Sequence, residues 1–512
     1  MGGKLCSGCL LVIGGAIVSV VSLKLVSTNC ALAQITPDST LPNNSTVKQE
    51  GNTRNIEGGT RAGSNLFHSF REFSVPTGSE VHFSNATDIQ NIISRVTGGS
   101  ISNIDGIIRA NGTANLFLIN PNGIIFGENA SLNVGGSFVA TTANAIGFGN
   151  QGFFNATNPN TPSVLTVNPS AFFFNQIAAA PIQNNSVAPA GLEPGGFRAF
   201  GLRVPDGKSL LLVGGNINMD GGELNAYGGR VELGGLATRG TVGLLLDGDN
   251  LSLSFPADST RADISLVNDA RVYVEAAGGG SIAVNAQNLD ISGRSVLSAG
   301  IRRGLGSFGA VAGDIALNAI GEIKIVGSGV FNIVQSQADG NTGKIDITAT
   351  SLRLSDGSLL QASTSGQGDA GSVIIDARGN VSFNNGFALS TVQRTGKGKG
   401  GDIRISAESL YVTNGAQLQA STSGQGDAGS VIIDARGNVS FDGTSSDGRF
   451  TSAAFSTVQQ TGVGKGGNVR ISAESLYVTN GAQLQASTSG QGDAGSVIID
   501  ARGNVSFDGT SS

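Results

Sequence analysis

The second half of the chain alternates hydrophobic and polar residues over short runs. In residues 402–407, apolar side chains occupy every second position, namely Ile403, Ile405 and Ala407. A period of two residues is typical of a β-strand that buries one face. Two further runs follow at 410–413 and 417–421, separated by turn residues that tolerate positive φ angles. The stretch therefore predicts three short strands and three corners.

This pattern recurs along the chain. The segment GQGDAGSVIIDARGNVSF begins at Gly366, Gly424 and Gly490, so its copies lie 58 and 66 residues apart. A shorter pattern of glycine, alternating apolar residues and alanine recurs more often, and its alanines are Ala286, Ala319, Ala349, Ala377, Ala407, Ala435, Ala473 and Ala501. The eight extra residues between the later copies fall within residues 442–455, where we expect a surface loop.

A unit of three short strands cannot bury its inward face alone, so successive units must stack and pair their strands. The repeat therefore predicts an all-β fold, a single-stranded right-handed parallel β-helix, in which residues 270–512 form coils of about 28–30 residues. Other repeat folds fit less well. Helical solenoids need a 3.6-residue period, which the sequence lacks, and propeller blades usually run to about 40 residues or more.

Residues 34–200 are also rich in predicted strands but do not share this register. They hold 15 of the 24 phenylalanines, all between Phe67 and Phe200. A β-helix exposes unpaired strand edges at its end and needs a distinct cap. We therefore predict a separate domain with an amino-terminal cap over residues 34–200, with residue 270 as its outer limit.

The first 33 residues have the features of a secretory signal peptide. Lys4 gives a positive start, residues 10–23 are apolar, and Ala31-Leu32-Ala33 forms a cleavage site before Gln34. We expect cleavage between Ala33 and Gln34. The alternative of an uncleaved membrane anchor is disfavoured by the glycines and serines within the apolar stretch.

All three cysteines, Cys6, Cys9 and Cys30, lie within the predicted signal peptide. A lipid anchor on Cys30 is a further alternative, but the residues before it match a lipidation signal poorly. The mature chain would therefore contain no disulfide, although it enters an oxidising compartment. This absence fits a chain that crosses a second membrane unfolded, and equally a large β-structure that needs no crosslinks.

The composition offers few candidates for chemistry. Without Lys4 and Lys24, 29 basic residues face 37 acidic ones, and a net charge of −8 makes nucleic acid an unsuitable partner. His68 and His82 are the only histidines, and without cysteine no His/Cys metal cluster can form. We therefore predict no metal, no cofactor and no enzymatic activity.

Two repeated polar motifs offer alternatives to this prediction. Polysaccharide lyases share the β-helix fold, but their reactive residues form one unique cleft, whereas Asp376-Ala377-Arg378 recurs at 434–436 and 500–502. A repeated charge pair favours surface solvation or a ladder between coils. Gly368-Asp369-Ala370-Gly371 resembles calcium-binding repeats, but those have a period of about nine residues.

The amino-terminal half contains two ordered motifs. Residues 116–124 read LFLINPNGI and end in Asn120, Pro121, Asn122, Gly123 and Ile124; GSFVAT follows at 136–141. Upstream, GSNLFHSF at 63–70 contains Asn65, Leu66, Phe67, His68, Ser69 and Phe70. In this order after a signal peptide, the motifs resemble the secretion domain of filamentous haemagglutinin and related haemolysins, the two-partner secretion exoproteins, in their cyanobacterial form. The resemblance is strong over residues 34–143 and weaker to residue 236, and the NPNL tetrapeptide of some members has no match.

The resemblance implies a pectin-lyase-like β-helix and a route of export. The Sec machinery would carry the chain to the periplasm, and a partner outer-membrane β-barrel transporter would capture its amino-terminal domain. The chain would then fold outside the cell, either released or at the outer-membrane surface. In this process the turn Asn120 to Ile124 would be recognised by the transporter or would form a structural corner of a coil.

An adhesin-like exoprotein is the leading functional hypothesis, with a host-cell, surface or polysaccharide ligand that the sequence does not identify. One alternative is the stalk of a contact-dependent toxin, whose carboxy-terminal toxic domain would have to follow the incomplete last repeat at Ser512. Another alternative is a secreted polysaccharide lyase or hydrolase.

Overall fold

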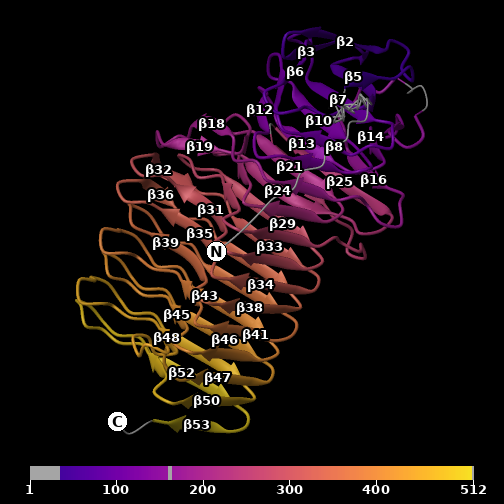
Figure 1. Cartoon of the computed structure of the whole chain (residues 1–512). Coiled ribbons are helices and arrows are strands. Elements are labelled where there is room, and N and C mark those ends of the chain that lie inside the picture. The colour runs from indigo at the N-terminus through magenta and orange to yellow at the C-terminus, as the bar shows by residue number, and fades with distance from the viewer. Residues whose placement is uncertain (1–34, 160–163, 249, 510–512) are drawn as a thin grey trace, which may run out of the picture. The chain divides into compact units, whose positions relative to one another are not determined.

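The repeating half of the chain folds into coils of three strands. In the computed structural model, which describes residues 35–159, 164–248 and 250–509, one coil comprises β43 (Ile403–Ala407), β44 (Leu410–Thr413) and β45 (Gln417–Gln419). Each strand pairs in parallel with its counterpart in the next coil, so that the coils stack along one axis (Figure 1). The predicted parallel β-helix is confirmed. The predicted signal peptide and its cleavage site, Ala33 and Gln34, lie outside the described residues.

Three sheets form the faces of the stack. The first face is a 16-stranded sheet that contains β1 (Thr36–Pro37), β4 (Thr60–Ala62), β5 (Asn65–Glu72), β7 (Asn91–Val96), β10 (Asn115–Ile119), β13 (Phe138–Thr141), β21 (Ser209–Gly214), β24 (Arg230–Gly235), β29 (Ser281–Ala286), β33 (Ile315–Ala319), β37 (Ile345–Ala349), β40 (Val373–Ala377), β43, β46 (Val431–Ala435), β49 (Val469–Ala473) and β52 (Val497–Ala501).

The second face has 13 strands, which are β8 (Ser102–Ile104), β11 (Ile124–Phe126), β17 (Ile182–Asn184), β22 (Ile217–Asp220), β27 (Ile264–Val267), β30 (Leu289–Ser292), β34 (Glu322–Val326), β38 (Ser351–Ser355), β41 (Val381–Asn384), β44, β47 (Asn438–Asp442), β50 (Ser475–Thr479) and β53 (Val505–Asp508). 

The third face consists of two sheets in succession. The amino-terminal one contains β2 (Ser45–Glu50), β3 (Thr53–Gly58), β6 (Glu80–Phe83), β9 (Ile107–Ala110) and β12 (Ser131–Asn133). The second contains β20 (Leu202–Arg203), β23 (Glu223–Asn225), β28 (Arg271–Tyr273), β31 (Val296–Ile301), β35 (Gly329–Val334), β39 (Leu359–Thr364), β42 (Phe387–Leu389), β45, β48 (Ala453–Phe455) and β51 (Gln483–Gln485).

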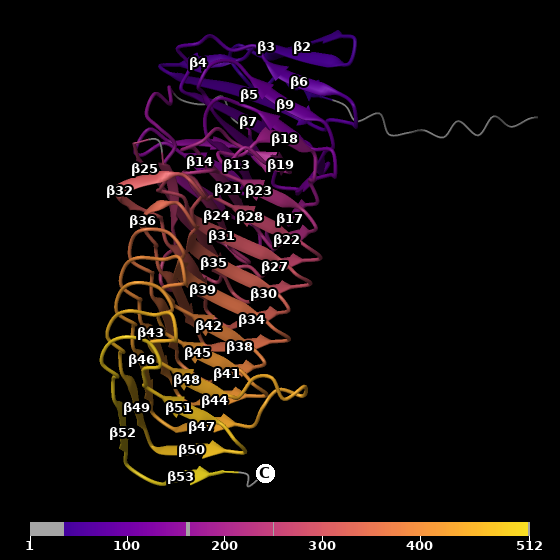
Figure 2. The same ribbon diagram turned by 90° about the vertical axis from the view of Figure 1, so that its left-hand side faces the viewer.

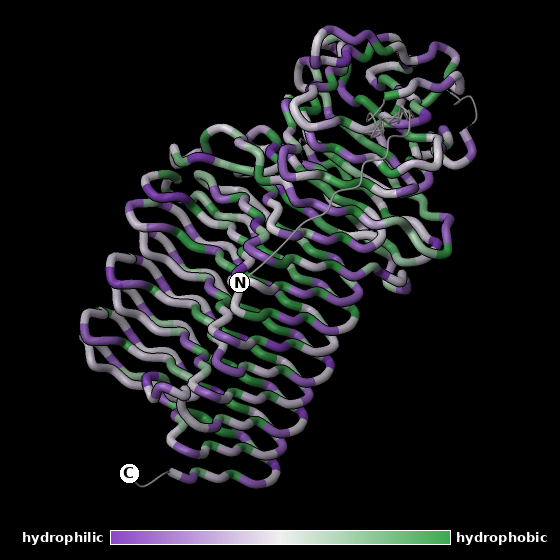
Figure 3. Tube along the Cα trace, viewed as in Figure 1, coloured by the Kyte–Doolittle hydropathy of each residue, from purple (hydrophilic) through white to green (hydrophobic). Residues whose placement is uncertain are grey.

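The coil register follows the alanines of the repeat. Ala286 pairs with Ala319, Ala349 with Ala377, Ala407 with Ala435 and Ala473 with Ala501. The apolar members of each strand face one continuous core that runs through the coils. Figure 3 shows hydrophobic residues returning at the same place on successive coils. The alternating pattern therefore predicted both the strands and their pairing.

The insertion between the later repeats is also where the sequence predicted it. It forms the exposed loop between β47 and β48, closed by an antiparallel bridge between Thr444 and Thr451. The flanking strands keep their pairing with β44 and β45 on one side and β50 and β51 on the other.

Three further elements project from the corners of the coils. A five-stranded antiparallel sheet, here called the side sheet, contains β14 (Ala145–Gly147), β15 (Phe153–Asn155), β16 (Ala171–Phe174), β25 (Gly240–Asp247) and β26 (Asn250–Ser254). The hairpin of β18 (Pro189–Leu192) and β19 (Arg198–Phe200) lies beside the third face at β23 (Figure 2). The third element pairs β32 (Gly306–Val311) with β36 (Asp339–Asn341).

The side sheet explains why the amino-terminal half lacked the repeat pattern. On β5, Leu66 and Phe70 face the core of the coils, whereas Phe67 belongs to a second core beneath the side sheet. Both surfaces of this part of the first face are buried, so its strands read as continuous apolar runs. Eleven of the 15 phenylalanines thus fill the two cores, while the antiparallel strands β1, β2 and β4 lie at the start of the stack. The predicted domain limits at residues 200 or 270 remain a prediction.

The repeated arginines form a ladder, as the sequence suggested, but their partners are not the aspartates of the same motif. Arg436 pairs with Glu408 at 2.8 Å and donates a hydrogen bond to the carbonyl of Arg378 at 2.6 Å. Arg502 repeats this arrangement with Glu474 and the carbonyl of Arg436. These side chains are exposed, so the ladder contributes little stability per pair.

No helix within the described residues is long and apolar enough to span a membrane.

Candidate functional site in the amino-terminal coils

The NPNGI motif forms the corner between β10 and β11. The backbone N–H of Gly123 donates to the carbonyl of Asn120 at 3.1 Å, which closes a turn, and the N–H of Asn122 donates to the Asn120 side chain at 3.0 Å. Asn and Pro favour such turns because the Asn side chain bonds to backbone two residues on and proline fixes φ. Gly123 has φ +122°, a positive value that glycine adopts more readily than residues with a Cβ atom. Ile124 then starts β11 and is fully buried.

The two asparagine side chains of the corner bind the preceding coil. Asn120 Nδ2 donates to the Ser100 carbonyl at 3.0 Å and to Ser102 Oγ at 2.9 Å, and Asn122 Nδ2 donates to the Gly98 carbonyl at 2.6 Å. Asn120 is fully buried, and only Asn122 is partly exposed. Because a buried amide must be hydrogen-bonded, these contacts fix the spacing of the two coils. In the folded protein the motif is a structural corner that offers little surface to a partner.

The upstream segment, Asn65 to Phe70, is the buried strand β5. Its first residue starts a ladder of asparagine side chains across three coils: Asn91 Nδ2 donates to Asn65 Oδ1 at 2.9 Å, and Asn115 Nδ2 donates to Asn91 Oδ1 at 3.0 Å. Asn65 Nδ2 also donates to the carbonyls of Leu165 and Val167. The ladder therefore joins the start of three first-face strands to the segment before β16.

The structure places the two motifs two coils apart on the first face, on either side of β7. In the pairing of β5, β7 and β10, Ser69 lies opposite Arg95, and Arg95 lies opposite Ile119, the residue before Asn120. One strand, β7, separates the two motifs. The sequence placed them in one domain but did not predict this arrangement, because no repeat in this part of the chain indicates which strands pair.

A buried arginine at this position was missed by the sequence interpretation. Arg95 is fully buried and donates to Ser69 Oγ at 2.9 Å, Thr40 Oγ1 at 2.8 Å and the Asn155 carbonyl at 2.7 Å. Its guanidinium also lies 4.2 Å from the centre of the Phe154 ring. Burial lowers the pKa of Arg95 to about 10, and nearby Asp38 opposes this shift. The sequence feature that could have indicated a buried arginine is its place in the largely apolar run NIISRV, residues 91–96.

Asp38 is the anionic partner in this network. Burial favours a raised pKa, but hydrogen bonds from Thr40, Thr97 and Ser69 outweigh it and hold the pKa of Asp38 below its ordinary value. Thr97 Oγ1 donates to Asp38 Oδ2 at 2.6 Å, and Ser69 Oγ donates to the same oxygen at 2.8 Å. The network ties the first described residues to β5, β7 and the side sheet. We call Asp38, Thr40, Ser69, Arg95 and Thr97 the cap network.

Comparison with known proteins decides what this region is. A family model described as the TPS secretion domain, where TPS denotes two-partner secretion, matches residues 33–284. Residues 33–284 belong to the TPS secretion domain family. The matched residues contain both motifs, the cap network and the side sheet. The predicted family resemblance is thus confirmed.

The chain is also similar to two proteins of Haemophilus influenzae. The Heme/hemopexin-binding protein of Haemophilus influenzae is 35% identical over 103 residues, which cover 20% of this chain and only 10% of that protein. The crystal structure of the HMW1 secretion domain from Haemophilus influenzae matches with a TM-score of 0.55 and 21% identity, covering 85% of this chain and 97% of that chain. At this identity the likeness concerns the fold alone.

The histidines of the secretion domain have structural contacts. His68 is buried, lies 2.9 Å from Ser45 Oγ through its Nδ1 atom, and packs against Phe83 with ring centres 5.3 Å apart. Burial lowers its pKa to about 3, so the ring is neutral at physiological pH. His82 hydrogen-bonds with Asn55 and Asn111. Within the described ranges, no group of three or more His, Cys, Asp or Glu side chains could hold a metal ion.

Proposed function

We propose that this chain is exported by a partner outer-membrane transporter and acts as an adhesin-like exoprotein. The match of residues 33–284 to the TPS secretion domain carries this proposal. In such a pathway the Sec machinery delivers the chain to the periplasm, and the transporter captures the secretion domain. The surface or secreted location, the transporter and the adhesive role all belong to the proposal.

The burial of the two motifs suggests when they act. Asn120 and Ile124 are fully buried in the folded coil, as are Asn65 and Phe70 in β5. A transporter can therefore read these residues only before the coils close. Once outside, the same residues set the corner after β10 and the asparagine ladder of the first coils, on which later strands pair. Because a coil gains stability only from its neighbours, folding that starts at this end propagates along the stack.

The repeats determine the length of the proposed adhesin. Each coil advances the stack by one strand spacing, about 4.8 Å, and the first face runs through 15 successive strands with no break in their pairing. Such a rod holds its distal coils away from the secretion domain. Corner loops tolerate insertion, as the loop between β47 and β48 shows, so binding surfaces can vary without disturbing the core.

Deletion of the gene for the partner transporter tests the export route. We expect the chain to accumulate in the periplasm and to be protected from protease added to intact cells. Complementation with the transporter gene should restore protease sensitivity at the surface or release into the medium. A periplasmic protein that uses Sec alone serves as the control for envelope integrity. Unchanged surface appearance in the deletion strain would overturn the proposal.

A further inference from the structure

The hairpin of β18 and β19 forms one wall of a recess on the third face. The recess has a volume of about 340 Å³, and its lining includes Glu193, Phe197, Glu223, Arg271, Tyr273 and Arg302. These residues come from the hairpin, from β23 and β28, and from the segment after β31. The volume lies at the lower end of the range for small-molecule sites, about 300–1,000 Å³.

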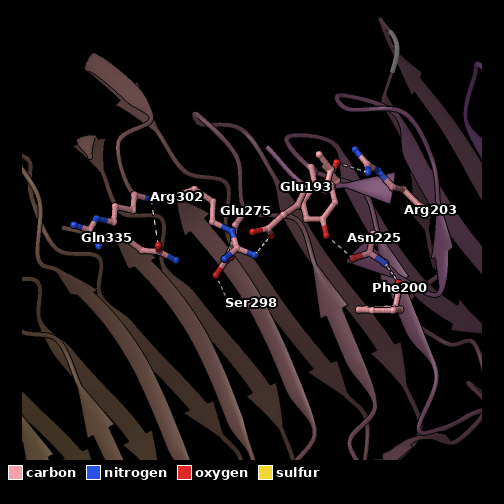
Figure 4. A network of polar contacts seen from close by, with 11 residues as sticks. Glu193, Phe200, Arg203, Asn225, Glu275, Ser298, Arg302 and Gln335 are labelled. Carbon is pink, nitrogen blue, oxygen red and sulfur yellow. Dashed lines mark hydrogen bonds and ion pairs between the residues drawn. The ribbon is translucent and has the colours of Figure 1, made fainter. Parts of the chain in front are cut away.

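Buried ion pairs hold the hairpin rigidly over the coils. Arg302 pairs with Glu193 at the hairpin tip and with Glu275 at 2.7 Å, and Ser298 donates to Glu275 (Figure 4). On the other side, Arg203 Nη1 donates to the carbonyls of Ala190 and Leu192 at 3.0 and 2.6 Å. A site whose walls are fixed before binding loses less conformational entropy when a ligand enters.

One buried acceptor in the recess has no donor. Glu193 is 6% exposed, and its Oε1 atom has no hydrogen-bond partner within the described part of the chain, while Oε2 pairs with Arg302. A buried carboxylate oxygen without a donor costs free energy, so this atom favours a ligand that brings an O–H or N–H group. Burial raises the pKa of Glu223 in the same recess, although Arg271 opposes this shift.

Exposed aromatic rings stand beside this acceptor. Phe197 at the hairpin tip is 71% exposed and Phe200 is 38% exposed, and Tyr273 is half-buried. Aromatic residues normally bury such area, and a ring exposed at the rim of a recess offers its face to an apolar surface. The recess thus combines aromatic faces with fixed polar groups.

The charges of the recess are balanced. Glu193 and Glu223 line the recess together with Arg198, Arg271 and Arg302, and Arg271 lies 3.8 Å from Glu223. Glu275 does not line the recess but balances Arg302, with which it pairs at 2.7 Å. A phosphate or other anion would meet two carboxylates, and a cation would meet three guanidinium groups. A neutral ligand with several hydroxyl groups can instead accept from arginine and donate to glutamate in charge-assisted hydrogen bonds.

From these observations we propose that the recess between the β18–β19 hairpin and the third face binds a neutral pyranose unit of a saccharide. The apolar face of the sugar ring packs on Phe197 and Tyr273, and its hydroxyl groups bond to Glu193, Glu223 and Arg271. The site lies outside the export motifs, so this inference does not depend on the transporter.

Binding by the purified full-length mature chain tests the site. Saturation-transfer NMR with cellotetraose, maltotetraose and N,N′-diacetylchitobiose measures contact with neutral pyranoses, and inorganic phosphate and digalacturonate serve as charged probes. We expect at least one neutral probe to bind and Phe197→Ala to weaken it about fivefold to tenfold. Tyr273→Phe should retain stacking and lower affinity less.

Phe450→Ala is the matched control, because Phe450 is an exposed ring on the loop between β47 and β48, outside the recess. Its affinity should equal that of the unmodified chain. Circular dichroism and thermal unfolding establish that each variant is folded. The proposal is overturned if folded protein binds no neutral probe, if only charged probes bind, or if Phe197→Ala binds unchanged.

Discussion

Glycine positions in the coils are set by contact between successive coils. A Cβ atom added to Gly429 would lie 1.9 Å from the carbonyl oxygen of Gly401, and one added to Gly495 would lie 1.8 Å from that of Gly467. No side chain fits at these distances. The high glycine content, 78 residues, therefore reflects backbone packing at the corners as well as turn conformation.

Gly429→Ala tests this contact, since no positive φ at this residue adds strain of its own. We expect the free energy of unfolding in urea to fall by about 3 kcal/mol, because the backbone of an adjacent coil must shift. Gly99→Ala is the control, since nothing lies within 4 Å of the added Cβ atom. Its stability should change by less than about 1 kcal/mol. Equal effects of the two substitutions would contradict the proposed packing.

His68 should make stability depend on pH. Burial lowers its pKa to about 3 in the folded chain, whereas an unfolded histidine titrates near about 6.5. Between these values the unfolded state binds more protons, so stability rises with pH and is lost as pH falls below about 6.5, by up to about 1.4 kcal/mol per pH unit. Urea unfolding at several pH values should show that His68→Gln removes this component. His82→Gln is the control, and an unchanged slope in His68→Gln would refute the assignment.

At the scale of elements, the sequence predicted the repeated strands well and the inserted ones poorly. A strand with one buried face repeats its period in the sequence, as Ile403 and Ile405 do. β16 instead pairs with β25, which lies beyond two intervening coils, and no local pattern marks that partner. The cap network is similar, because Arg95 meets Thr40 and Asn155 only after the coils have stacked. Polar contacts between residues far apart in the chain produce no periodic pattern, so the sequence alone does not predict them.

The NPNGI corner can be tested as an element. Asn120→Ala with Asn122→Ala removes three hydrogen bonds to the preceding coil, from Asn120 to Ser100 and Ser102 and from Asn122 to Gly98. We expect export to fall severalfold, measured as the ratio of surface-exposed to periplasmic protein. The distal coils should retain the urea transition of the unmodified chain when the purified variant is refolded.

A corner in the repeats supplies the matched control for this variant. Asn414 Nδ2 donates to Asn384 Oδ1 at 2.7 Å, at an exposed corner between the second and third faces. Asn384→Ala with Asn414→Ala should leave export unchanged. Normal export of the Asn120/Asn122 variant would show that the corner has no special role, and a reduction of the same size in both variants would assign the effect to asparagine loss in general.

At the scale of the whole molecule, the stack behaves as a sum of coils joined by neighbour contacts. Residues 361–368 and 419–426 both read QASTSGQG, so deletion of residues 366–423 joins two identical contexts. The deletion removes β40 to β45, which form two complete coils. After it, β46 meets β37 with the same sequence, VIIDA, that β40 presented.

We expect the shortened chain to fold and to be exported, because no register changes and the secretion domain is intact. Its urea transition should have a smaller m-value, in keeping with the smaller surface exposed on unfolding, and small-angle scattering should give a shorter particle. Deletion of residues 91–148, a segment of equal length, removes β7 to β14 and with them Arg95 and the NPNGI corner, and this variant should neither fold nor reach the surface. Aggregation of the first variant, or normal export of the second, would contradict a division of labour in which the amino-terminal coils start the fold and the repeats extend it.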